Sequence, residues 1–207
     1  SKTIFLNPAP AGFFYACIPA HRTSGRKGTR HPMDSLHIAI VGYGTAGQAA
    51  ALLLSRDGHR VEVFERAEQP GPVGAGFLLQ PTGLQVLWEL GLLPDVLAHG
   101  RRVNRLYGET PCGRAVMDMR YAGLDAYLFG LGMQRGALFT LLAEAWAGQG
   151  EIHRGHAIEA VSDDTRRVRD QHGRWHGPFD LVVSADGSAS RLRVATGAVK
   201  REAVYPW

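Results

Sequence analysis

The most informative segment of the chain is Leu36-His37-Ile38-Ala39-Ile40-Val41-Gly42-Tyr43-Gly44-Thr45-Ala46-Gly47. Its first six residues are mostly apolar and rich in β-branched side chains, which predicts a buried parallel strand over 36–41. The three glycines follow at the spacing of a dinucleotide-binding loop. Apolar residues between Ala46 and Leu54 then recur at helical spacing, and Asp57-Gly58 ends the predicted helix.

A second strand is predicted over 60–65, where Arg60-Val61-Glu62-Val63-Phe64-Glu65 alternates in polarity. The unit is therefore strand, glycine loop, helix and strand, with an acid at its end. In such units the first glycine permits the turn, the second lets a pyrophosphate approach, and the third allows close helix packing. The amides and the helix dipole stabilise the phosphate charge, and the acid accepts hydrogen bonds from a ribose.

These roles make Gly42, Gly44, Thr45, Ala46, Gly47 and Glu65 candidate cofactor-binding residues, with Arg66 beside them. The acid at position 65 disfavours a 2′-phosphate, so NADP is not expected in this loop. The loop does not by itself separate FAD from NAD, because both present an ADP half.

Three further segments carry a family resemblance. Residues 74–83 form a Gly-rich loop and apolar stretch that ends in Gln80-Pro81 and leads into a predicted helix over 84–92. Residues 133–138 place Arg135 at the start of another helix. Residues 180–193 read as a buried strand, an Asp186-Gly187 turn and then a helix.

With these segments the chain resembles the aromatic-hydroxylase group of FAD-dependent monooxygenases, which includes relatives of 4-hydroxybenzoate and salicylate hydroxylases. The resemblance runs from about residue 34 to 207. It implies that Gln80, Arg135, Asp186 and Gly187 contact the cofactor, and it extends the second motif to Ser190 and Arg193. No substrate acid or base can be assigned.

The resemblance also implies an α/β fold, with a Rossmann-like FAD/NAD(P)-binding domain and an interleaved, incomplete β-rich substrate domain. We expect the FAD-binding domain over 34–207, with part of the substrate domain around 103–133. Short strands are predicted over 103–133 and 151–177. Family members are much longer, so we expect the chain to be truncated and inactive on its own.

The activity that the resemblance implies is monooxygenation. NAD(P)H reduces FAD, O2 adds to the reduced flavin, and a flavin hydroperoxide transfers one oxygen atom to an aromatic or similar small substrate. Two alternatives stay open. One is another FAD-dependent member of the family, such as an epoxidase, a halogenase or a prenyl-chain reductase. The other is a non-catalytic fragment that binds a nucleotide.

The charge of +4 belongs to the first part of the chain. Residues 1–33 contain five basic residues and no acids, whereas the other 174 residues carry 18 basic and 19 acidic side chains. A general nucleic-acid surface is therefore not expected. We predict that residues 1–32 are a disordered or non-native leader, with Met33 as a plausible start, and that no segment spans a membrane.

Two cysteines, Cys17 and Cys112, provide no disulfide framework, so a cytoplasmic location is the expectation. No metal site is expected either. The pairs His153 and His156, and His172 and His176, fall in predicted strands or turns and lack paired cysteines.

Overall fold

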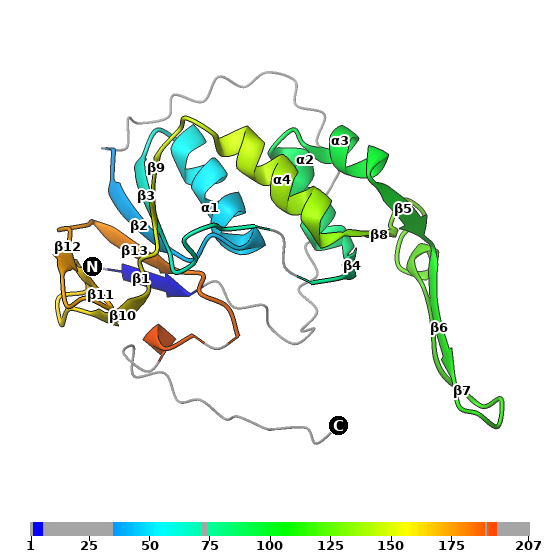
Figure 1. The fold of residues 1–207 in the computed structure, drawn as a ribbon. Coiled ribbons are helices and arrows are strands. Elements are labelled where there is room, and N and C mark those ends of the chain that lie inside the picture. The colour runs from blue at the N-terminus through cyan, green and yellow to red at the C-terminus, as the bar shows by residue number, and fades with distance from the viewer. Residues whose placement is uncertain (1, 6–34, 72–73, 189, 194–207) are drawn as a thin grey trace.

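A five-stranded parallel sheet forms the centre of the molecule (Figure 1). The structure is a computed structural model that describes residues 2–5, 35–71, 74–188 and 190–193. The strands are β1 (Lys2–Phe5), β13 (Leu181–Ser184), β2 (His37–Val41), β3 (Arg60–Glu65) and β9 (Glu151–Arg154), in that spatial order. Each neighbouring pair is parallel.

Helices cover one face of this sheet. The helix α1 (Thr45–Arg56) follows β2 and packs against α4 (Arg135–Trp146), which precedes β9. Ile38 and Ile40 point to this side, where they join Leu138 and Leu142 in the larger core. Figure 1 shows that α1 and α4 run side by side and that α1 begins close to the end of β2.

A small antiparallel sheet covers the other face. It consists of β10 (Ile158–Val161), β11 (Val168–Asp170) and β12 (Trp175–His176). The alternate residues of the central strands, Ala39, Val41 and Phe64, form a second core with its side chains. The strands β2 and β13 are thus buried on both faces, as their continuous apolar sequences predict.

Another antiparallel sheet, called the second sheet from here on, lies beyond the helices and consists of β4 (Gly76–Leu79), β8 (Gly130–Gln134) and β5 (Gly100–Val103). The helices α2 (Pro81–Glu89) and α3 (Leu93–Ala98) connect β4 to β5. A hairpin of β6 (Arg105–Glu109) and β7 (Ala115–Arg120) extends away from the body, and the short helix η1 (Tyr121–Gly123) follows β7 at the base of the hairpin.

The structure confirms the predicted α/β class, the strand-loop-helix-strand unit, and the short strands in 103–133 and 151–177. One expectation fails for four residues. Lys2–Phe5, which belong to the predicted leader without regular structure, form the edge strand β1, because the outer edge of β13 offers a row of backbone partners. Residues 6–34 of that leader, and most of the helix predicted after Asp186-Gly187, lie outside the described residues.

Within the described part of the chain, no helix combines the length and apolar character that crossing a membrane requires.

Candidate functional site

The carboxyl ends of β2, β3, β9 and β13 meet at one edge of the parallel sheet, where open α/β sheets bind their ligands. Backbone hydrogen bonds hold the segments that leave these strands. The Gly42 N–H donates to the Phe64 carbonyl at 2.8 Å, and the His156 N–H donates to the Glu65 carbonyl at 2.9 Å. The ends of the strands therefore form one connected rim.

A cavity of about 270 Å³ opens at this rim. Four of the residues predicted from the sequence line it together, namely Gly42, Glu65, Arg66 and Asp186. They come from three separate segments of the chain. Its other walls come from Val41, Phe64, His156, Ala157, Ile158, Glu159 and Arg191.

Two glycines of the loop are required by the packing of the protein itself. Gly42 has a φ of +102°, and a Cβ there would lie 2.5 Å from the Ala185 carbonyl oxygen. A Cβ on Gly47, which is buried, would overlap the Gly42 carbonyl oxygen. These positions hold the loop against β13 and close to the start of α1, so a larger side chain at either one would displace the backbone.

Gly44 is different because no described atom of the protein lies within 4 Å of a Cβ built there. Its φ of −71° is open to any residue, so the backbone does not explain the glycine either. Gly44, Thr45 and Ala46 are exposed, and among the described residues no side chain caps the start of α1. The first turn of α1 thus presents free amides and the positive end of a helix dipole to an open space.

The Glu65 carboxylate faces the glycine loop. Its Oε2 accepts a hydrogen bond from the Tyr43 N–H at 2.8 Å, and its Oε1 accepts one from the Ala67 N–H at 2.9 Å. The side chain is only partly buried and lines the cavity, so its remaining acceptor sites face the ligand space. Glu65 therefore ties the end of β3 to the loop as well as offering a place for ribose hydroxyls.

Tyr43 anchors the loop from below. The side chain is 5% exposed, and its ring packs against Phe139 and Trp146 of α4 at centroid distances of 5.9 Å. Burial raises the pKa of the Tyr43 hydroxyl, more than the positive charge of Arg154 lowers it. The sequence did not reveal this role, because the glycine motif specifies no residue type at position 43 and so gives no signal for a core contact.

The Asp186-Gly187 turn closes the rim behind β13. Asp186 accepts a hydrogen bond from the Ser184 hydroxyl at 2.6 Å, and Gly187 has a φ of +88°. The Arg193 guanidinium donates to the Ser188 carbonyl at 2.7 Å and so braces the turn from the chain that follows. The buried Ser190 hydroxyl has no hydrogen-bond partner among the described residues.

Arg135 and Gln80 do not line this cavity. Arg135 is exposed at the start of α4, close to Gly74 and 5.8 Å from the centre of the Phe77 ring. Gln80, at the start of α2, accepts a hydrogen bond from the Tyr121 hydroxyl at 2.8 Å. Both belong to the second sheet and the helices that follow its strands.

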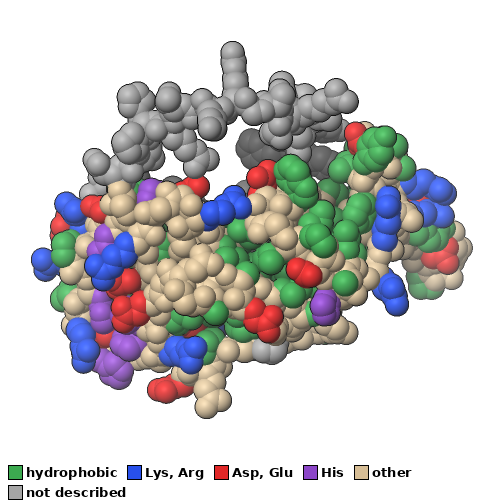
Figure 2. Space-filling view, turned by 90° about the horizontal axis from the view of Figure 1, so that it is seen from above, with side chains coloured by type: hydrophobic (Ala, Val, Ile, Leu, Met, Phe, Trp, Pro, Cys, Tyr) green, Lys and Arg blue, Asp and Glu red, His purple; other side chains and the backbone are tan. Residues whose placement is uncertain are grey.

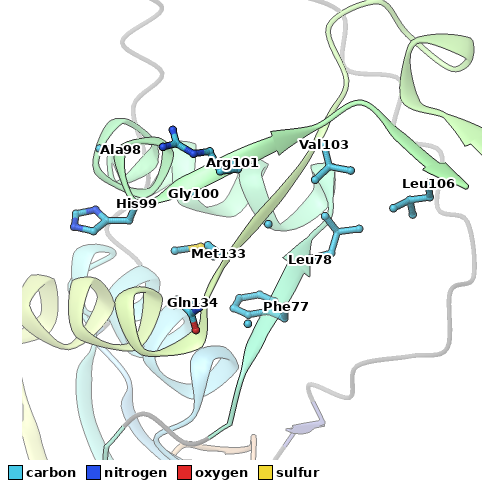
Figure 3. Close-up of a pocket in the computed structure, with 12 residues that line it drawn as sticks. Phe77, Leu78, Ala98, His99, Gly100, Arg101, Val103, Leu106, Met133 and Gln134 are labelled. Carbon is cyan, nitrogen blue, oxygen red and sulfur yellow. The ribbon is translucent and has the colours of Figure 1, made fainter.

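A larger groove of about 720 Å³ lies on that second sheet, away from the glycine loop (Figure 3). Apolar side chains from all three strands face it, and Arg101, His99 and Gln134 add polar groups. The site as a whole thus has a polar cavity at the glycine loop and a broader apolar groove on the second sheet. The apolar side chains of the groove are Phe77, Leu78, Val103, Leu106 and Met133.

Sequence reasoning also missed the cavity residues that follow β9. In the sheet, β9 pairs with β3 and places Glu65 opposite Arg154, so the residues just after both strands become neighbours. A strand prediction over 151–154 combined with the rule for parallel sheets could have found His156 and Ala157. Arg191 carried no signal beyond the motif in which it lies.

Comparison with known proteins gives a consistent family assignment. The family model described as FAD binding domain matches residues 35–207. A 3-amino-4-hydroxybenzoate 2-monooxygenase from Streptomyces cremeus is 33% identical over 168 residues, which are 76% of this chain and 41% of that protein. A kynurenine 3-monooxygenase from Salinispora arenicola is 44% identical over 168 residues, which are 75% of this chain and 37% of that protein.

Solved structures agree. The 2-methyl-3-hydroxypyridine-5-carboxylic acid oxygenase is 29% identical with a TM-score of 0.68, over 79% of this chain and 42% of that one. PqsL from Pseudomonas aeruginosa is 32% identical with a TM-score of 0.68, over 84% of this chain and 49% of that one. The chain spans about two fifths of the length of the curated relatives that it matches.

Proposed function

Because this chain belongs to the FAD binding domain family, we propose that it is the FAD-binding part of an NAD(P)H-dependent monooxygenase. The enzyme would insert one oxygen atom from O2 into a small aromatic substrate. The observation that carries the proposal is the open space at Gly44 beside the uncapped start of α1. Neither the backbone conformation nor the packing of the described residues requires glycine at position 44. A glycine at such a position indicates a ligand that approaches the backbone closely.

The cavity fits the ADP half of FAD. We assign the pyrophosphate to the amides of Gly44, Thr45 and Ala46, where the dipole of α1 stabilises its negative charge. We assign the ribose hydroxyls to Glu65, whose carboxylate is held by two backbone amides and keeps acceptor sites toward the cavity. Arg66 and Asp186 line the same space.

We assign the remainder of the cofactor to the second sheet. The Arg135 guanidinium stays charged and offers a fork of N–H donors to a phosphate or carbonyl oxygen. Gln80 and the Asp186-Gly187 turn complete the proposed set. Bound FAD would supply the redox chemistry, taking electrons from NAD(P)H and passing them to O2. The chain's own contribution is to bind and orient it.

The substrate class follows from the relatives, whose names specify hydroxylated benzoates and kynurenine. We propose an aromatic compound of similar size, with O2 as the second substrate. The groove on the second sheet, which Phe77, Met133 and Arg101 line, suits an aromatic acid. We further propose that the protein works in the cytoplasm, because Cys17 and Cys112 give no disulfide framework.

The test starts with the purified chain of 207 residues. FAD is added, the excess is removed, and the visible absorption spectrum is recorded. Retained flavin bands near 375 and 450 nm would support the assignment, since these are properties of the flavin itself. NADH and NADPH oxidation is then followed with 3-hydroxybenzoate and kynurenine. A folded protein that retains no flavin would contradict the proposal, and flavin retention without oxidation would leave a nucleotide-binding unit without turnover.

A further inference from the structure

Three histidine rings gather where β9 meets the small antiparallel sheet. His153 lies in β9, His156 follows it, and His176 lies in β12. The centroid of the His156 ring is 5.8 Å from that of His153 and 5.6 Å from that of His176. Figure 2 shows histidine side chains grouped with acidic and basic ones at the end of the molecule that carries this sheet.

A buried carboxylate lies beside two of these rings. Asp170 is 1% exposed, and its Oδ1 accepts hydrogen bonds from the backbone N–H groups of His172 and Arg174 at 2.9 and 3.0 Å. Its Oδ2 faces the His176 Nε2 at 2.8 Å. One oxygen therefore holds the β11–β12 turn, and the other is directed at the histidine.

The fold therefore brings a buried carboxylate and two imidazole rings together, with the Asp170 Oδ2 directed at the His176 ring and the His156 ring beside it.

The tautomer of His156 is set by the backbone carbonyl of Arg154. Its Nδ1 lies 2.8 Å from the Arg154 carbonyl oxygen, which can only accept, so Nδ1 carries the hydrogen. In the neutral ring Nε2 then keeps its lone pair. A hydrogen bond from the other ring nitrogen to a carbonyl is the arrangement that orients histidines as metal ligands.

We propose that His156, Asp170 and His176 bind one divalent transition-metal ion of the zinc class. The candidate ligand atoms of these residues all lie within 4.8 Å of one another. Two imidazoles and a carboxylate are ligands that zinc accepts, with water in the fourth tetrahedral position. Ligands at about 2.0–2.1 Å from zinc lie roughly 3.3 Å apart. His176 and Asp170 would separate by about half an ångström, and His176 would bind zinc through Nε2 as a neutral ring whose one hydrogen lies on Nδ1.

A second group of acids and histidine, Glu62, Glu151 and His153, is the weaker candidate. Both carboxylate oxygens of Glu62 already have partners, since Oε1 pairs with His37 and Arg60 and Oε2 pairs with His153. Glu151 is exposed. We therefore assign His153 to the wall of the proposed site, where its ring stacks on Phe64.

The pairs of histidines that are close in the sequence do not form this site. The fold joins His156, which follows β9, with a hairpin twenty residues further along the chain, and the carboxylate comes from that hairpin. The histidine spacing in the sequence led us to predict no metal site, and this proposal revises that prediction. The proposed site adjoins the cavity at the glycine loop, which His156 also lines, so FAD affinity of each variant is measured separately.

The test is zinc binding by the tag-free chain of 207 residues without FAD, measured in competition with a chromogenic chelator. We expect one ion per chain, with affinity falling in acid, because protons compete with the metal for its ligands. The variants His156→Ala and His176→Ala should each weaken binding at least about tenfold. His172→Ala is the matched control, because His172 is exposed in the same hairpin and lies outside the proposed ligand set.

Cobalt provides a second readout, because a tetrahedral site gives visible absorption bands that both ligand variants should abolish. Circular dichroism establishes that each variant is folded. The proposal would be overturned if the original chain bound zinc no more tightly than the His156→Ala and His176→Ala variants. An equal loss in His172→Ala would also overturn it. Neither result would bear on FAD binding, which is measured separately.

Discussion

Replacing Gly44 with Val should remove FAD binding while leaving the protein folded. A Cβ at this position meets no described atom within 4 Å, and the φ of −71° suits any residue. The protein thus has room for the new side chain. That room lies over the free amides of the first turn of α1, where the pyrophosphate is proposed to bind.

The two effects can be estimated separately. Val is a poor residue at the start of a helix, which costs about 1 kcal/mol of stability and about 2–4 °C in Tm for a chain of this size. Hydrogen bonds to charged groups contribute about 1.5–3 kcal/mol each, so blocking two of them should cost at least 3 kcal/mol. FAD affinity should therefore fall by at least about 100-fold.

Flavin fluorescence titration measures the affinity, and a thermal melt without FAD measures the stability. Gly47→Ala is the contrasting variant, because its Cβ would overlap the Gly42 carbonyl oxygen. It should cost about 3 kcal/mol or more, with a Tm loss of roughly 6–12 °C. Unchanged FAD affinity in Gly44→Val would refute the assignment of the loop, and a Tm loss as large as that of Gly47→Ala would refute the claim that the protein leaves this space open.

Three further predictions follow from the same structure. Glu65→Ala should weaken FAD binding by about 1–3 kcal/mol through lost ribose hydrogen bonds. It should lower the free energy of unfolding by a similar amount, because the Tyr43 and Ala67 amides lose their acceptor. FAD titration and urea unfolding measure the two effects, and no change in either would contradict the assignment. Arg135→Ala should lower FAD affinity by about 1–3 kcal/mol with Tm unchanged. Arg174 is another exposed arginine, outside the proposed site, and Arg174→Ala should leave FAD affinity unchanged. Equal losses of affinity in the two variants would contradict a specific contact by Arg135. Asp170 should make stability depend on pH below 4. Its pKa is about 2 in the folded chain and has an ordinary value of 3.8, so its contribution is complete above about pH 4 and is lost as pH falls toward 2. Urea unfolding of Asp170→Asn across that range should show a flatter profile, and a profile parallel to that of the original chain would contradict this account.

The elements around the glycine loop could be predicted from the sequence because local signals and tertiary packing agree there. The run from Ile38 to Val41 is buried on both faces, and the helix from Thr45 to Arg56 carries its apolar stripe toward the core. The glycines at 42 and 47 are fixed by close backbone contacts that any fold of this kind imposes. Here residue type, spacing and packing give the same answer.

The parts that the sequence did not reveal depend on contacts between distant segments. Tyr43 is an anchor only because α4 places Phe139 and Trp146 beneath it, and His156 reaches the cavity only because β9 pairs with β3. The strand β1 likewise depends on the free edge of β13. Such contacts follow from strand order, which local periodicity does not contain. The separation of Arg135 and Gln80 from the glycine-loop cavity has the same origin, since both belong to the second sheet.

The most direct test of the central claim is calorimetric titration of the chain with FAD, alone and in the presence of saturating ADP. If the glycine loop and Glu65 hold the ADP half, one FAD should bind per chain, ADP should compete with it, and riboflavin, which lacks this half, should not bind measurably. FAD binding that is unaffected by ADP, or riboflavin binding as tight as that of FAD, would contradict the account. Absence of FAD binding by the folded chain would contradict it as well.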